Sequence, residues 1–127
     1  MNHFISLDQA KQMTARYREQ KDNILKPEFV QSGVLSISET FERAAFDRLL
    51  SQPGCTSLRI YNGMSEDLKL RAIIVGVNEK DEDMLPISQA STLSAGTATD
   101  SGDDDNVIVE IGTLCPPQCG TPSDLNP

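Results

Sequence analysis

Three cysteines are the side chains of this sequence best suited to metal or redox chemistry. Cys55 stands alone, whereas Cys115 and Cys119 are separated by three residues, two of them prolines. Zinc in a closed structural site takes four Cys or His ligands, and the chain holds one histidine, His3. These four residues form a metal-site hypothesis, although no second closely spaced cysteine pair exists and His3 lies near a chain end, where fraying is common.

Ordinary thiols are the simpler expectation for the cysteines. Cys115 and Cys119 lack Cys-x-x-Cys spacing, and no thioredoxin-like βαβ pattern precedes them. A residue before a proline favours extended backbone, so Cys115 and Pro116 should carry the chain away from a local bridge. Bridging needs a sharp reversal that brings the two Cα atoms within about 7 Å. We therefore expect free thiols in a reducing compartment, with a Cys115–Cys119 disulfide as the alternative.

Catalytic and cofactor motifs are not recognisable in the chain. Any Ser-His-Asp or Cys-His arrangement would have to use His3, and neither a Walker A nor a Gly-x-Gly-x-x-Gly motif occurs. The acidic run 100–105 fails the EF-hand template, because Gly102 takes a ligand position and Ile111 stands where a bidentate glutamate belongs. We therefore expect no catalytic residue, no cofactor-binding residue and no cofactor.

The net charge of −8 is concentrated in the second part of the chain. Residues 1–50 carry seven Lys and Arg against seven Asp and Glu, whereas residues 51–127 carry four against twelve. Such an acidic surface repels phosphate backbones and anionic lipids, which excludes nucleic acid and membranes as expected partners. No apolar run approaches the roughly 20 residues of a membrane span, and residues 1–4 do not resemble a signal peptide, so the expected location is cytoplasmic.

The N-terminal third has the patterns of two helices that would support these side chains. A capping box at 6–9 and apolar residues at helical spacing predict a helix to about Leu25, ended by Pro27. A second capping box, at 36–39, predicts another helix that Pro53 and Gly54 close. The first helix has a small excess of basic residues, which suits an acidic partner or the acidic run of a second copy. Those bases, counted to just past the helix, are Lys11, Arg16, Arg18, Lys21 and Lys26.

After Gly54 the apolar period changes to two, which is typical of strands. Residues 58–61 and 68–72 alternate on either side of Asn62-Gly63 and predict an antiparallel hairpin. The second strand continues as an apolar run through Val77, which indicates burial on both faces and a cover from the helices and from another element or subunit. Residues 107–111 predict a third strand paired with this hairpin. The expected fold is α+β, with two N-terminal helices packed on a small, mainly antiparallel sheet in the order α-α-β-β-β.

We expect one domain over residues 1–119, followed by an irregular tail at 120–127. Residues 88–106 are rich in small and polar types and predict a flexible acidic loop.

Several landmarks together resemble an uncharacterised family of small bacterial proteins, found mostly in Bacteroidota. These landmarks are the stretch 49–55 ending in Gly-Cys, Arg-Ile-Tyr in the hairpin, Ile-Val-Gly-Val at 74–77, and Cys-Pro-Pro-x-Cys at 115–119. The resemblance covers residues 36–119, supports the layout above and implies no activity. The sequence departs from the family where Glu79 to Glu82 replace an expected glycine-containing turn.

The sequence identifies no activity and leaves three function classes open. The first is a non-enzymatic protein-interaction or assembly module, with a protein partner or self-association. The second is a structural metal or thiol site on Cys55, Cys115 and Cys119. The third is a small-molecule-binding protein or enzyme with a pocket between helices and sheet, using residues such as Arg43, Arg48 or Tyr61.

Overall fold

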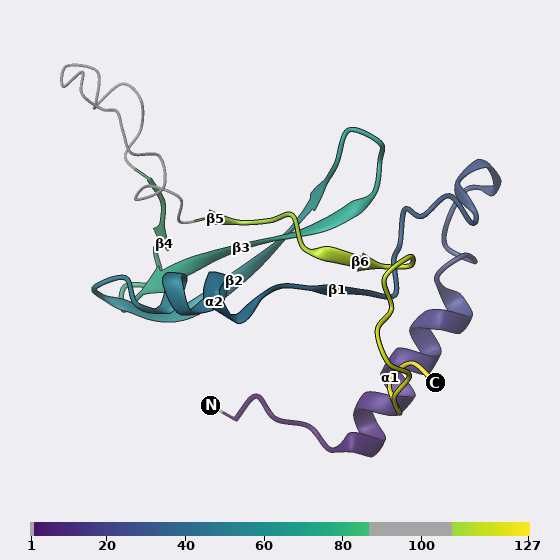
Figure 1. The fold of residues 1–127 in the computed structure, drawn as a ribbon, viewed down its shortest axis with the longest axis horizontal. Coiled ribbons are helices and arrows are strands. Elements are labelled where there is room, and N and C mark those ends of the chain that lie inside the picture. The colour runs from purple at the N-terminus through teal and green to yellow at the C-terminus, as the bar shows by residue number, and fades with distance from the viewer. Residues whose placement is uncertain (1, 87–107) are drawn as a thin grey trace. The chain divides into compact units, whose positions relative to one another are not determined.

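A computed structural model describes residues 2–86 and 108–127, which form two compact units (Figure 1). The first, here called the helical unit, combines Met1–Glu39, Met64–Leu70 and Thr113–Pro127. The second, the sheet unit, combines Thr40–Gly63 and Arg71–Gly112. Each unit is assembled from stretches that are distant in the sequence. The acidic loop predicted at 88–106 lies outside the described residues.

The helical unit contains α1, Leu7–Gln20, which begins where the first capping box predicts. The Gln9 amide donates to Ser6 Oγ at 3.1 Å, and the Ser6 amide donates to Gln9 Oε1 at 2.9 Å. The helix ends at Gln20, five residues before the predicted end, and Pro27 opens the short 3-10 helix η1, Pro27–Phe29. No residue of α1 is buried, so tertiary packing does little to extend it. Within residues 2–86 and 108–127, no helix has the length and apolar character needed to cross a membrane.

The second capping-box prediction is wrong. Residues Ser38–Thr40 form strand β1, which pairs with β6, Thr113–Cys115, and the Ile37 amide donates to the Cys115 carbonyl at 2.7 Å. Helix α2, Arg43–Leu50, starts later, after Glu42, and has no side-chain cap. Pairing with a segment about 75 residues further along therefore overrides a local helix signal.

The sheet unit is organised by the predicted hairpin, whose strands are confirmed as β2, Cys55–Met64, and β3, Leu70–Asn78. The predicted turn at Asn62-Gly63 is wrong, because these residues lie within β2 and the chain turns at 65–69, where the Ser65 amide donates to the Lys69 carbonyl. β3 also pairs antiparallel with β4, Asp83–Met84, and with β5, Ile108–Val109. Gly76 lies opposite Met84, and Ile74 lies opposite Val109. The third predicted strand is thus confirmed at its centre. The α+β class is also confirmed, but the order is not α-α-β-β-β, because α2 lies between β1 and β2.

Helix α2 packs closely on β3. A Cβ added to Gly76 would lie 3.0 Å from Cys55 Sγ and 3.6 Å from the Leu49 carbonyl, so the helix end approaches the strand where it lacks a side chain. α2 is the helix of this unit, whereas α1 belongs to the helical unit; the prediction that both helices pack on one sheet is therefore not what the structure describes.

The apolar stretch of β3 is buried inside a single chain. Ile74, Val75 and Val77 are almost fully shielded, as is Leu49 of α2. Of the two covers considered from the sequence, another element or another subunit, the structure therefore needs no second subunit, because one copy of the chain already removes these side chains from water.

Leu49→Ala tests the importance of this small core. Leu49 is 1% exposed, so its truncation should lower the free energy of unfolding by about 2–5 kcal/mol through lost burial and a cavity. The neighbouring Leu50 is 51% exposed, and Leu50→Ala should change stability by no more than about 0.5 kcal/mol. Urea unfolding followed by circular dichroism measures both. Equal effects of the two variants would contradict the assignment of Leu49 to the core.

Candidate functional site

The two C-terminal cysteines are joined, which corrects the expectation of free thiols. Cys115 and Cys119 form a disulfide with their Cα atoms 4.5 Å apart, and Cys55 remains a free, half-buried thiol. The peptide bonds before Pro116 and Pro117 are both cis, and the Gln118 amide donates to the Leu114 carbonyl at 3.0 Å. The hydrogen bond and the disulfide show that the chain reverses direction between Leu114 and Cys119, contrary to the extended path expected before a proline.

The structure does not assemble the four proposed zinc ligands. A disulfide offers no thiolate, so Cys115 and Cys119 cannot coordinate zinc in this state. His3 is exposed, and Cys55 belongs to the sheet unit, where its thiol donates to the Ser57 carbonyl at 3.3 Å. Across the described part of the chain, no three His, Cys, Asp or Glu side chains gather in a way that could hold a metal ion. The acidic run 100–105 lies outside that part.

The disulfide borders a groove of about 560 Å³ in the helical unit. One wall is the face of α1 that carries Met13 and Tyr17, and a second wall is the stretch 36–38 that leads into β1. The third wall comes from the C-terminal segment and includes Cys119 and Leu125. Residues 120–127, predicted as an irregular tail, thus form part of this site.

Hydrogen bonds hold the three walls of the groove together. The Tyr17 hydroxyl donates to the Ser36 carbonyl at 2.5 Å, and the Arg18 guanidinium donates to the Leu125 carbonyl. Burial, and then the charge of Asp22, raise the pKa of Tyr17, so this hydroxyl keeps its proton and remains a donor. The groove is consequently preformed, with Met13 and Leu125 offering apolar surface and Thr14 and Ser38 offering hydroxyl groups.

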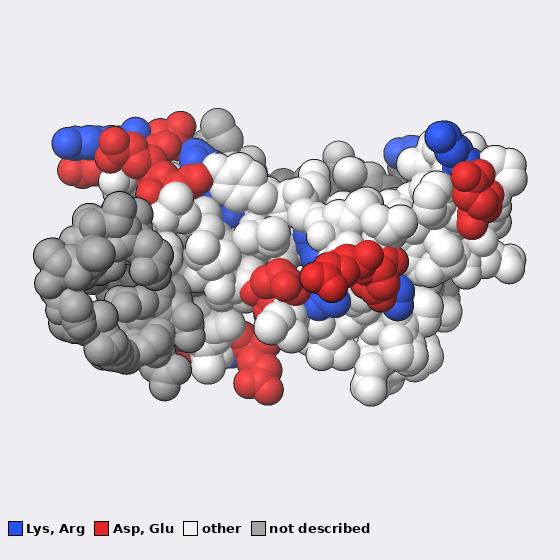
Figure 2. Space-filling model, turned by 90° about the horizontal axis from the view of Figure 1, so that it is seen from above, with Lys and Arg blue, Asp and Glu red and all other residues white. Residues whose placement is uncertain are grey.

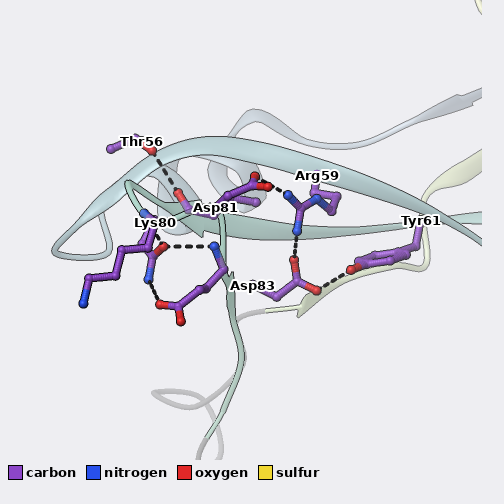
Figure 3. Close-up of polar contacts among 9 residues, drawn as sticks. Thr56, Arg59, Tyr61, Lys80, Asp81 and Asp83 are labelled. Carbon is purple, nitrogen blue, oxygen red and sulfur yellow. Dashed lines mark hydrogen bonds and ion pairs between the residues drawn. The ribbon is translucent and has the colours of Figure 1, made fainter.

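A second polar feature, on the sheet unit, joins β2 to the turn before β4 (Figure 3). The Arg59 guanidinium lies 2.5 Å from Asp81 Oδ1 and 2.5 Å from Asp83 Oδ1, and the Tyr61 hydroxyl donates to Asp83 Oδ2. We call these four residues the Arg59 cluster. The Tyr61 hydrogen bond, followed by the Arg59 guanidinium, holds the pKa of Asp83 below its usual range.

The Arg59 cluster lies on the face of the sheet opposite α2. A Cβ on Gly63 would touch Ile73 Cδ1, so Gly63 and Ile73 share a face, and strand alternation places Arg59 and Tyr61 on that face as well. Gly76 faces α2, which puts Val75 and Val77 on the Arg59 side. The cluster therefore links β2 to β4 and its preceding turn across β3, and two carboxylates already bind the guanidinium.

The structure does not bring Arg43, Arg48 and Tyr61 together. Arg43 pairs with Asp47 one turn along α2 at 3.2 Å, Arg48 lines an open surface hollow of that helix, and Tyr61 bonds to Asp83 on the other face. The groove could not be predicted from the sequence, because three separate stretches build it. The one indication in the sequence was that Met13 and Tyr17, four residues apart, lie on the same face of the predicted helix.

The link between Tyr61 and Asp83 is testable by titration. Since Asp83 has a lower pKa in the folded than in the unfolded protein, its ionised form favours folding above about pH 3.8, and this contribution is lost as the pH falls through the folded pKa. Tyr61→Phe should raise the pKa of Asp83, measured by NMR titration of the carboxyl carbon. Asp67, whose pKa is lowered first by Ser65, serves as the control and should not change. An unchanged Asp83 pKa would contradict the bond.

The disulfide should stabilise the helical unit. Its short loop predicts that Cys119→Ser lowers the free energy of unfolding by about 2 kcal/mol, because the unfolded chain regains freedom. Reductant should produce a similar loss in the wild type and none in the variant, as measured by urea unfolding. Cys55→Ser is the control and should retain the response to reductant. A wild type that is indifferent to reductant would show that the bond does not form in solution.

Comparison with known proteins adds no family to this description. No protein-family model matches the chain, and no curated protein or solved structure shows significant similarity to it.

Proposed function

We propose that the chain is a non-enzymatic protein-interaction module whose groove binds an apolar peptide segment with acidic flanks. The observation that carries this proposal is the preformed groove between α1, residues 36–38 and the C-terminal segment. Its volume of about 560 Å³ lies within the roughly 300–1,000 Å³ of binding sites, and its mixture of apolar walls and a few polar groups is typical of recognition sites.

Exposure and charge support a protein as the occupant. Met13 is 57% exposed at the groove although it is apolar, and covering it would be favourable. The basic excess on and just after α1 favours acidic residues beside the apolar anchor. On the face shown in Figure 2, charged side chains gather in a few clusters separated by uncharged surface. Depletion of charged residues is typical of the centre of a protein interface.

The described site supports binding better than catalysis. Tyr17 keeps its proton, and the Arg18 guanidinium is engaged by the Leu125 carbonyl, so the groove lacks a general base among its described lining residues. The family resemblance remains a prediction and supplies no activity.

The cellular location is also a prediction. The expected cytoplasmic location was based on the lack of a long apolar run and of a signal-peptide pattern in the sequence. The Cys115–Cys119 disulfide favours an oxidising compartment instead, because such bonds persist there.

Selection of peptides from a phage-displayed random library tests the proposal. Enriched peptides should carry an apolar anchor flanked by Asp or Glu, and a synthetic copy should bind at least about tenfold more weakly to Met13→Glu, which places a charge in the groove. Leu50→Glu is the matched control, since Leu50 is 51% exposed and lies on α2, and it should bind normally. Fluorescence anisotropy measures both affinities. Failure to enrich any sequence, or equal binding by the two variants, would refute the proposal.

A further inference from the structure

Strand β2 presents an open edge of the sheet. It pairs with β3, and among the described strands nothing pairs with its other side. A ten-residue strand in this position exposes a row of unpaired amide and carbonyl groups, which is a template for adding another strand. This edge belongs to the sheet unit and is separate from the proposed peptide groove.

The sequence of β2 lacks the features that usually block pairing at such an edge. Residues 55–64 contain neither proline nor lysine nor an acidic side chain, and their one charge, Arg59, is held by Asp81 and Asp83. Ile60, at the middle of the strand, is nevertheless 63% exposed. A long edge that has an exposed isoleucine at its middle and its one charge paired within the chain favours a strand as its occupant.

We propose that β2 pairs antiparallel with β2 of a second copy of this chain, forming a two-fold symmetric dimer with a continuous sheet. A two-fold axis perpendicular to the sheet keeps each residue on the same face in both copies. Directly opposed residues point to the same face, so their numbers must be both even or both odd. One residue of the strand therefore lies opposite its own copy, with the two-fold axis between the two copies.

Charge selects which residue lies on the axis. The midpoint of 55–64 falls between Arg59 and Ile60, so these two are the central candidates. An axis at Arg59 would oppose two guanidinium-bearing side chains directly, which is unfavourable. An axis at Ile60 opposes the two exposed isoleucines and sets each Arg59 against Tyr61 of the second copy. The second register buries apolar surface and avoids like-charge contact, so it is the one we assign.

Light-scattering mass over a range of concentrations tests the pairing. The wild type should shift from 13.9 kDa toward twice that mass as its concentration rises toward about 1 mM. Ile60→Lys should stay at the monomer mass, because it opposes two ammonium groups at the axis. Ile24→Lys is the matched control: Ile24 is also strongly exposed but lies in the helical unit, so this variant should dimerise like the wild type. Circular dichroism checks that both variants are folded.

Cysteine cross-linking tests the register independently of stability. In a Cys55→Ser background, Ile60→Cys should form an intermolecular disulfide under mild oxidation, because opposed residues bring their Cα atoms within bonding range. Asn62→Cys, which this register sets against Leu58, should cross-link poorly. A wild type that is monomeric at every concentration, dimerisation by Ile60→Lys, or more efficient cross-linking at 62 than at 60 would overturn the proposal. Peptide binding by the groove is unaffected by any of these outcomes.

Discussion

The burial of β3 is the constraint on which the sheet unit depends. Its apolar residues from Ile74 to Val77 need cover on both faces, and the chain supplies it by packing α2 on one face and placing the Arg59 cluster on the other. Gly76 makes the first contact close, since any side chain there would collide with Cys55 and Gln52. Both short strands, β4 and β5, pair with this same strand, so its position sets theirs.

The helical unit is stabilised in a different way, because it has little apolar core. Among the residues described, Cys115 is its one buried apolar side chain, and α1 contributes none. Covalent and polar links take the place of a core: the disulfide at Cys115, the Tyr17 bond to Ser36, and the Arg18 bond to Leu125. Small cores are commonly supplemented by disulfides for this reason. The same disulfide and hydrogen bonds position the walls of the groove, so the groups that stabilise this unit also shape the proposed binding site.

Elements that depend on neighbouring residues could be predicted from the sequence, whereas features that depend on distant segments of the chain could not. The capping box at Ser6 and the alternation through β2 and β3 are local patterns, and both are confirmed. The capping box at Ser36 was misleading because β1 gains hydrogen bonds from β6, which no nearby residue reveals. The disulfide was not expected because a residue before proline favours extended backbone, whereas the chain here reverses direction between Leu114 and Gln118. The groove could not be predicted because its walls are brought together only by such contacts between distant stretches of the chain.

The placement of charge connects the two proposed surfaces. In the sheet unit, Asp81 and Asp83 draw the one guanidinium of β2 across β3, which covers the central strand and leaves the β2 edge without an outward charge. In the helical unit, the Arg18 guanidinium is used in a similar way and donates to the Leu125 carbonyl of the C-terminal segment. In both units, an arginine that could repel a neighbouring chain is bonded to oxygen atoms of its own unit.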